Sequence, residues 1–228
     1  RKKDVLRKVF GYDSFRTGQE EIVDNILLGR DVCGIMPTGA GKSICYQLPA
    51  LLLPGITIVV SPLISLMIDQ VKALNEAGVH AAYINSALTE NQITKALYNA
   101  MCGRYKIVYV APERLETNRF LEFVLNADIS MITIDEAHCI SQWGQDFRPS
   151  YLKIVNLIKM LPKRPVVSAF TATATQAVKD DIVCVLGLNN PFIKVTGFDR
   201  SNLYFEVRQP NNKDTEVLNY VLSHRDDS

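Results

Sequence analysis

Short apolar runs rich in β-branched residues alternate along the chain with longer segments whose apolar residues recur every three or four positions. The short runs predict strands and the longer segments predict helices. Because the strand segments are apolar almost throughout, we expect helices to cover both faces of the sheet. The predicted strands are Val32–Met36, Thr57–Ser61, Ala81–Asn85, Lys106–Val110, Met131–Ile134 and Val166–Phe170.

Helical patterns lie between these strands, so the two kinds of element alternate. Such alternation predicts an α/β fold, a doubly wound and mainly parallel sheet with helices on both faces. Sheets of this kind bind ligands at the carboxyl ends of their strands. The predicted helices are Gly18–Leu28, Lys42–Leu52, Leu63–Ala77, Glu90–Met101, Phe120–Asn126, Tyr151–Met160, Thr175–Leu186 and, near the end, Asp214–His224.

Composition narrows the class of protein. Hydrophobic residues make up 47% of the 228 positions, so a sizeable core can form. The formal net charge of +1 excludes nucleic-acid binding through bulk positive charge, and any DNA contact must come from a local groove or loop. The five cysteines form no CxxC pair, which predicts free thiols and no zinc site. Without an apolar run of membrane length, we expect an intracellular protein of the bacterial cytoplasm and nucleoid, or of a eukaryotic nucleus.

A glycine-rich segment follows the first predicted strand and opens a helix, as a phosphate-binding loop requires. Its glycines permit backbone conformations that turn successive N–H groups toward phosphate oxygens. The lysine can reach the β and γ phosphates, and the serine can bind magnesium. Met36 stands where a first glycine is expected, and an ordinary glycine-rich helix start is the alternative. The predicted ATP-binding residues of this loop are Thr38, Gly39, Ala40, Gly41, Lys42 and Ser43.

Two adjacent carboxylates, Asp135 and Glu136, directly follow the strand predicted at 131–134. We expect Asp135 to hold magnesium and Glu136 to orient the attacking water, with Lys42 completing the catalytic set. Acidic residues at a helix start also act as caps, which is the alternative. Together with the upstream loop, the pair predicts hydrolysis of ATP with magnesium as cofactor.

At this point the chain resembles the RecQ family of superfamily 2 DNA helicases, in its bacterial form. The match runs from Leu6 to about Leu203, and the motifs occur in the family's order. The matching segments are Phe10–Tyr12, Phe15–Arg16 and Gln19; Val60–Leu66 with Asp69–Gln70; Ala111–Arg114; Asp135–His138; Ser141–Pro149; and Thr171–Ala174. The resemblance implies a first RecA-like motor domain over residues 1–203. Residues 204–228 are then an exit linker and the truncated start of a second RecA-like domain.

Residues near the N-terminus resemble that family's adenine-recognition motif. Gln19 has the donors and acceptor to pair with the adenine edge. Tyr12 and Arg16 can cover a purine face by stacking and cation–π contact. The alternatives are a surface position for Gln19, a core position for Tyr12 and a surface ion pair for Arg16.

The segment Ser141–Pro149 resembles the aromatic-rich loop that marks RecQ proteins. Its polar context suits an exposed Trp143 that stacks on single-stranded bases, although a lone tryptophan is often a core anchor. The resemblance implies that Trp143, Phe147 and Arg148 sense DNA and signal to the ATP site. We expect His138, Thr171 and Thr173 to take part in that coupling. Gln145 stands where most members of the family have histidine.

The resemblance implies ATP hydrolysis coupled to single-stranded DNA translocation and 3′–5′ unwinding of partial duplexes, in repair and recombination. A second RecA-like domain in the same chain is the expected partner, and these 228 residues alone are expected to be weakly active at most. A nucleotide-dependent nucleic-acid binding module and a small-molecule kinase are the alternatives. His138 and the aromatic loop argue against an RNA helicase of the Asp-Glu-Ala-Asp type.

Overall fold

The computed structural model describes residues 1–144, 146–197, 206–207, 209 and 212–223. The chain divides into two compact units, Arg1–Gly197 and Phe198–Ser228, and each is described by itself. The first unit carries every candidate site residue. Gln145, the departure from the family pattern, lies outside the described residues.

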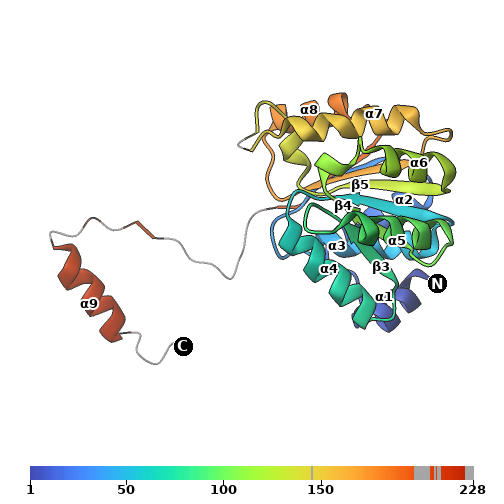
Figure 1. Ribbon diagram of the computed structural model, residues 1–228. Helices are drawn as coiled ribbons and strands as arrows, with labels where there is room; N and C mark the ends of the chain where they lie inside the picture. The colour runs from blue at the N-terminus through green and yellow to red at the C-terminus, as the bar shows by residue number, and fades with distance from the viewer. Residues whose placement is uncertain (145, 198–205, 208, 210–211, 224–228) are drawn as a thin grey trace. The chain divides into compact units, whose positions relative to one another are not determined.

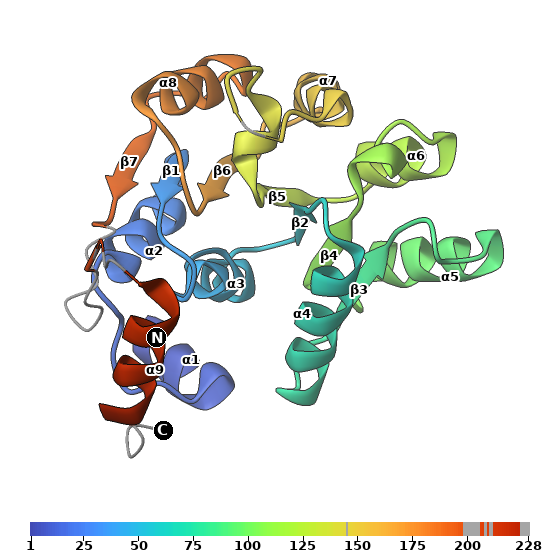
Figure 2. The same cartoon turned by 90° about the vertical axis from the view of Figure 1, so that its left-hand side faces the viewer.

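Seven parallel strands form the sheet of the first unit, in the order β3-β4-β2-β5-β6-β1-β7 (Figures 1 and 2). The predicted fold class is confirmed. Because all strands run the same way, their carboxyl ends share one edge of the sheet. The strands are β1 (Val32–Ile35), β2 (Ile56–Val60), β3 (Ala81–Ile84), β4 (Ile107–Val110), β5 (Ile129–Ile134), β6 (Val166–Thr171) and β7 (Phe192–Val195).

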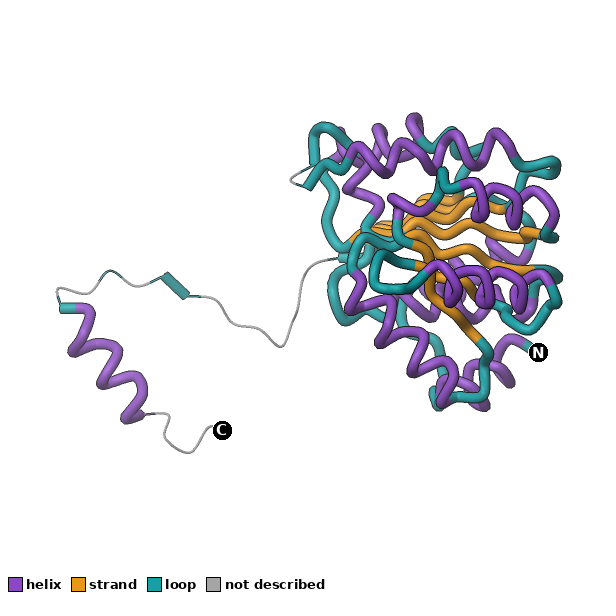
Figure 3. Tube along the Cα trace, in the orientation of Figure 1, coloured by secondary structure: helices purple, strands orange, loops and turns teal. Residues whose placement is uncertain are grey.

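Helices cover both faces of this sheet (Figure 3). Apolar residues of α5, α6, α7 and α8 form the core on one face, and those of α2, α3 and α4 form it on the other. Helix α1 packs on α2 and α3 through Leu6. The helices are α1 (Lys2–Phe10), α2 (Gln19–Leu27), α3 (Lys42–Leu52), α4 (Ile64–Glu76), α5 (Glu90–Met101), α6 (Asn118–Asn126), α7 (Leu152–Met160) and α8 (Gln176–Val185).

All six predicted strands and all seven predicted helices of this unit are confirmed, with ends that differ by at most two residues. Strand β7 and helix α1 were not predicted. The edge strand β7 alternates half-buried and exposed residues, so it lacks the fully apolar run of the others. In α1 only Leu6 is fully buried, which leaves the helix a weak apolar pattern.

One buried carboxylate joins the amino ends of β1 and β6, two of the strands that carry the site. Asp31, which is 2% exposed, forms an ion pair with Arg164 and accepts from the N–H groups of Val167 and Asn189 at 2.9 and 2.7 Å. These contacts hold β1 beside β6 and the segment leading to β7. The register of β1 on β6 therefore places the segments after both strands next to each other.

The second unit contains α9 (Lys213–Ser223), which confirms the predicted terminal helix. Its apolar residues Val217, Leu218, Val221 and Leu222 are exposed. The expected boundary between residues 203 and 204 lies outside the described residues and stays a prediction, as does most of the predicted extended segment 198–210. In the described part of the chain, every helix is too short or too polar to cross a membrane.

Candidate nucleotide and DNA site

The glycine-rich loop joins the end of β1 to the start of α3. Gly39 and Gly41 have φ angles of 83° and 79°, in the left-handed region that other residues enter only with strain. Gly41 directly precedes α3 and has no side chain that could accept a hydrogen bond from the helix. The first N–H groups of α3 are therefore not capped by a side chain. The Lys42 ammonium donates to the Met36 carbonyl oxygen at 3.2 Å, which places the charge across the loop. This cradle fits a phosphate chain.

Gln19 is buried beneath the loop and is 1% exposed. Its Nε2 donates to the carbonyl oxygens of Ala40 and Gly41 at 3.2 and 3.1 Å, and its Oε1 accepts from the Arg16 N–H at 2.8 Å. The alternative of a surface glutamine is therefore wrong. A Cβ atom at Gly41 would lie 2.5 Å from Nε2, so only glycine allows this approach. Both amide protons of Gln19 are bound to the loop, and its pairing with adenine stays a prediction.

Arg16 and Tyr12 lie on the exposed side of the same loop. The Arg16 Nη1 donates to the Gly39 carbonyl oxygen at 2.5 Å, and its guanidinium carbon lies 5.9 Å from the centroid of the Tyr12 ring. Tyr12 is 46% exposed, so the alternative that it is a core residue is wrong. The two side chains form an exposed pair beside the loop. This pair is suited to stacking on a base.

The two carboxylates follow β5, at the same edge of the sheet. Burial, together with the charge of Glu136, raises the pKa of Asp135 to about 6. A hydrogen bond from His138 lowers the pKa of Glu136, and the Lys42 ammonium also acts to lower the pKa of both carboxyls. Glu136 has a φ of 48°, a strained value for a non-glycine residue. The charge of Lys42 from the phosphate loop and the two acids therefore act within one site.

His138 joins these acids to the segment that follows β6. Its Nδ1 lies 2.8 Å from Thr171 Oγ1 and 3.3 Å from Glu136 Oε2. Contacts with the Cys139 sulfur and with Glu136 raise the pKa of His138 to about 10. Thr171, which is 1% exposed, also donates to the Thr173 carbonyl oxygen at 3.1 Å. Thr173 itself is exposed. The predicted coupling residues His138 and Thr171 are thus in direct contact.

The aromatic loop follows the short helix η2 (Ala137–Ile140) and leads into η3 (Pro149–Tyr151). Trp143 is 77% exposed, so the alternative of a core anchor is wrong. Phe147 is half-buried. Arg148 donates to Asp146 Oδ2 at 2.8 and 3.1 Å and to the Pro62 carbonyl oxygen at 3.4 Å. The loop is therefore tied to the segment that follows β2 while its tryptophan faces outward.

Two contacts at this site were not predicted. The Tyr151 hydroxyl donates to the Asp135 carbonyl oxygen at 3.0 Å, which fixes the backbone that carries the acid. Cys139 and Asp146 lie against His138, with the sulfur 3.8 Å from Nε2 and 3.7 Å from Asp146 Oδ2. In this part of the sequence the aromatic motif is the clear signal, and the spacing of Cys139 and Asp146 does not mark them as neighbours.

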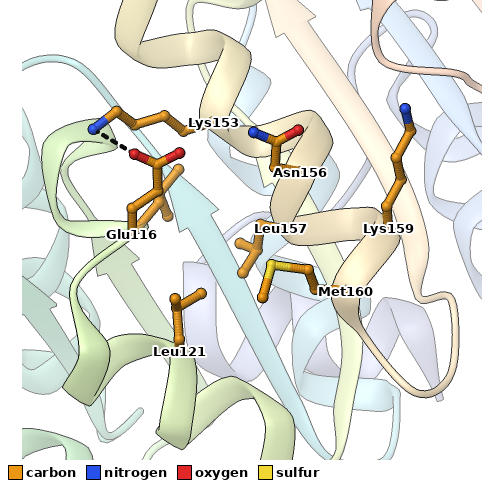
Figure 4. Close-up of a pocket in the computed structure, with 8 residues that line it drawn as sticks. Glu116, Leu121, Lys153, Asn156, Leu157, Lys159 and Met160 are labelled. Atoms are coloured by element: carbon orange, nitrogen blue, oxygen red, sulfur yellow. Dashed lines mark ion pairs between the residues drawn. The ribbon is translucent and has the colours of Figure 1, made fainter.

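A groove of about 420 Å³ lies on another part of the molecule, between α6 and α7 (Figure 4). Its charged residues Glu116 and Lys153 pair at 2.9 Å, and Leu121, Leu157 and Met160 make it partly apolar. The predicted nucleotide and DNA residues do not line this groove. This groove is therefore separate from the predicted nucleotide and DNA site.

Comparison with known proteins identifies the family of this chain. The family model for DEAD/DEAH box helicases matches residues 16–181, which span the glycine-rich loop, the acids and Thr171. This chain belongs to the DEAD/DEAH box helicase family. The matched range covers well over half of the chain and includes the strands β1, β5 and β6 on which the site stands.

Relatives within this family include bacterial RecQ helicases. The chain is 49% identical to the ATP-dependent DNA helicase RecQ of Bacillus subtilis over 99% of its length, and 44% identical to that of Pasteurella multocida over 97%. The predicted resemblance to RecQ is confirmed. The chain spans 38% and 35% of the length of these two relatives.

Among solved structures, the helicase MrfA bound to DNA and AMPPNP resembles this chain with a TM-score of 0.69. The match covers 86% of this chain and 29% of MrfA, at 18% identity. At that identity the likeness supports the helicase-type fold alone.

Proposed function

We propose that this chain is an ATP-binding motor domain of a RecQ-type DNA helicase, which couples ATP hydrolysis to movement on single-stranded DNA. The observation that carries the proposal is the contact chain at the sheet edge. Lys42 of the phosphate loop acts on Asp135 and Glu136, Glu136 contacts His138, and His138 contacts Thr171. Three segments that follow β1, β5 and β6 therefore share one polar site.

The residues of the loop are suited to hold a nucleotide. The left-handed Gly39 and Gly41 bring Thr38, Ala40 and the start of α3 around the phosphates, where N–H groups and the helix dipole favour negative charge. Lys42 supplies the positive charge for the β and γ phosphates. Tyr12 and Arg16 stand at the exposed side for the base, with Gln19 beneath.

Asp135 and Ser43 offer oxygen ligands of the kind that magnesium prefers, and the ion would neutralise charge on the phosphates. The raised pKa of Asp135 reflects a buried carboxylate that a cation would stabilise. Glu136 stays ionised through its contact with His138, so it can accept a proton from an attacking water.

The exposed Trp143 and the half-buried Phe147 are suited to stack on bases of a single strand. A base on Trp143 would push on a loop that begins at η2, which carries His138. Through His138 the displacement reaches Glu136 directly. Thr173 is exposed and accepts a hydrogen bond from Thr171. A displacement of His138 would therefore also reach Thr173, in the segment that follows β6.

In the whole protein we propose a second RecA-like domain that closes on this site, with translocation in the 3′–5′ direction and unwinding of partial duplexes in repair and recombination. An arginine from such a domain typically increases the rate of hydrolysis by a factor of about 10³–10⁵. The names of the RecQ relatives, which are DNA helicases, support DNA as the partner.

The test compares ATP hydrolysis by these 228 residues with hydrolysis by a longer protein that contains the second domain, each with and without single-stranded DNA. We expect weak turnover at most from the short chain and DNA-stimulated turnover from the longer one. Strand separation by the 228 residues alone would contradict the proposed division of labour. Phosphoryl transfer to a small-molecule acceptor without any response to DNA would favour a kinase instead.

A further inference from the structure

The polar side chains inside the aromatic loop form a cluster whose donors differ in kind from those of the magnesium site. Its ligand atoms are His138 Nε2, Cys139 Sγ and an oxygen of Asp146, all within 4.8 Å of one another. The sulfur lies 3.8 Å from the nitrogen and 3.7 Å from Asp146 Oδ2. Bonds of about 2.3 Å to sulfur and 2.0–2.1 Å to nitrogen in a tetrahedron place these donors about 3.5 Å apart. The observed spacings are close to that value.

The surrounding contacts hold the donors in place. Thr171 donates its hydroxyl proton to Thr173, so its oxygen accepts from Nδ1–H of His138, which leaves Nε2 as the ligand nitrogen. Glu136 lies 3.3 Å from the same Nδ1, and a carboxylate on the far nitrogen of a ligating histidine is a recurring feature of metal sites. Arg148 orients Asp146 through two hydrogen bonds, both to Oδ2, so a metal would share Oδ2 with the guanidinium or take Oδ1. Gly144 lets the loop close, because a Cβ atom there would lie 2.6 Å from the His138 carbonyl oxygen.

We propose that His138, Cys139 and Asp146 form a binding site for a borderline-soft divalent metal of the Zn²⁺ class, with water in the fourth position. A thiolate and an imidazole select such ions over Mg²⁺ and Ca²⁺, which prefer oxygen ligands. On coordination the thiol proton, and the Nε2 proton where present, pass to solvent while the sulfur–metal and nitrogen–metal bonds form. The charges of thiolate and carboxylate then balance the dication.

Because the sequence contains no CxxC pair, it predicts no zinc site. Here the third ligand comes from Asp146 instead, seven residues after Cys139, and the loop folds back to deliver it. An occupied site would clamp the aromatic loop onto η2 and engage His138. This consequence rests on the proposed function, since it predicts that Zn²⁺ lowers DNA-stimulated hydrolysis.

Binding is tested on the 228-residue chain with Co²⁺ as a spectroscopic probe and Zn²⁺ as competitor. We expect a thiolate-to-cobalt charge-transfer band with strong tetrahedral d–d bands, both removed by one equivalent of Zn²⁺. The emission of Trp143, the single tryptophan, should change with the same midpoint. Asp146→Asn and Cys139→Ser should each weaken Zn²⁺ binding by at least about tenfold.

Matched controls separate this site from adventitious binding. Cys102 and Cys184 are exposed, and replacing both with serine should leave the cobalt spectrum unchanged. Because Cys139 is buried, Cys139→Ser can lower stability, whereas Asp146 lies on the surface and its variant should fold normally. A cobalt spectrum without the thiolate band, or one lost only with Cys102 and Cys184, overturns the site.

The regulatory consequence has its own readout, in a longer protein with the second domain. Zn²⁺ at the concentration that fills the site should lower DNA-stimulated ATP hydrolysis, and Asp146→Asn should relieve that inhibition. A filled site without inhibition would overturn the clamp and leave the metal site standing. Failure of DNA to stimulate hydrolysis even without Zn²⁺ would instead contradict the proposed function.

Discussion

The imidazole Nδ1 of His138 lies 2.8 Å from the hydroxyl oxygen of Thr171, although 33 residues separate them in the chain. This contact joins the segment after β5 to the segment after β6, beside the acids of the proposed ATP site. Any movement of η2 therefore changes the surroundings of Thr171, and the reverse holds as well. It links the short helix that precedes the aromatic loop to the segment after β6, which lies beside β1 in the sheet.

We expect Thr171→Val to reduce DNA-stimulated ATP hydrolysis while nucleotide binding is retained. The substitution keeps the shape of the side chain but removes the partner of His138 and the donor to Thr173. The buried change should cost about 1–2 kcal/mol of unfolding free energy. Hydrolysis is measured with and without single-stranded DNA in a protein that contains the second domain.

Thr133→Val is the matched control. Thr133 also lies in the sheet core, and its hydroxyl pairs with Ser168 at 2.9 Å, away from His138. Its loss should lower stability by a similar amount and leave the DNA response intact. Equal effects of the two variants on DNA stimulation would contradict the coupling role of Thr171.

Gln19→Glu should weaken ATP binding and lower thermal stability. The carboxylate can still accept from the Arg16 N–H, but it cannot donate to the Ala40 and Gly41 carbonyl oxygens, which lose their partner. A buried acceptor left without a donor costs about 1–3 kcal/mol. Nucleotide affinity by calorimetry and thermal melting give the two readouts.

Gln19→Ala tests the adenine role separately, through the preference for ATP over GTP. Guanine presents a carbonyl oxygen where adenine presents an amino group, so a residue that pairs with this edge discriminates between the two. We expect the preference to fall. An unchanged preference with weakened binding of both nucleotides would restrict Gln19 to support of the phosphate loop.

Lys42→Ala should abolish productive ATP binding, whereas Glu136→Gln should retain binding and stop hydrolysis. Lys42 provides charge to the phosphates in the bound state, and Glu136 acts on water. Binding is measured by calorimetry and turnover by phosphate release, in a protein with the second domain. Normal turnover by Glu136→Gln would show that another group activates the water.

Asp135→Asn should stabilise the nucleotide-free chain at about pH 7.5. The folded pKa of Asp135 is raised from 3.8 to about 6, so its ionisation costs stability as the pH rises from about 4 to about 6. That difference corresponds to on the order of 3 kcal/mol above this range, and the gain should shrink toward pH 4. Urea unfolding at several pH values measures it, with Asp180→Asn on the exposed face of α8 as the control. A gain that does not vary with pH would show that ionisation is not its cause.

Trp143→Ala should change the unfolding free energy by less than about 0.5 kcal/mol, because an exposed side chain contributes little packing. In a protein with the second domain it should abolish DNA stimulation of hydrolysis and keep basal turnover. Tyr98→Ala, which removes an exposed aromatic from α5, is the control and should alter neither property. A strongly destabilised Trp143→Ala that still responds normally to DNA would reverse the assignment.

The sequence by itself determined which segments form the six buried strands, that the sheet is mainly parallel, and which segments carry the chemistry. Periodicity is a local property, and motifs such as the glycine-rich loop and Asp135–His138 need only their neighbours to be read. The edge strand β7 was not predicted, because a half-exposed strand of four residues has only a weak pattern of apolar residues.

Only the tertiary structure decided which side chains meet. It buried Gln19 under the phosphate loop, exposed Trp143, and joined His138 to Thr171. It also brought Asp146 back onto Cys139 and His138. These contacts depend on the lateral order of β1, β6 and β5 and on the closure of the loop at Gly144, which are long-range properties. Local patterns leave them open, because the free energy that selects them comes from packing between segments distant in the chain.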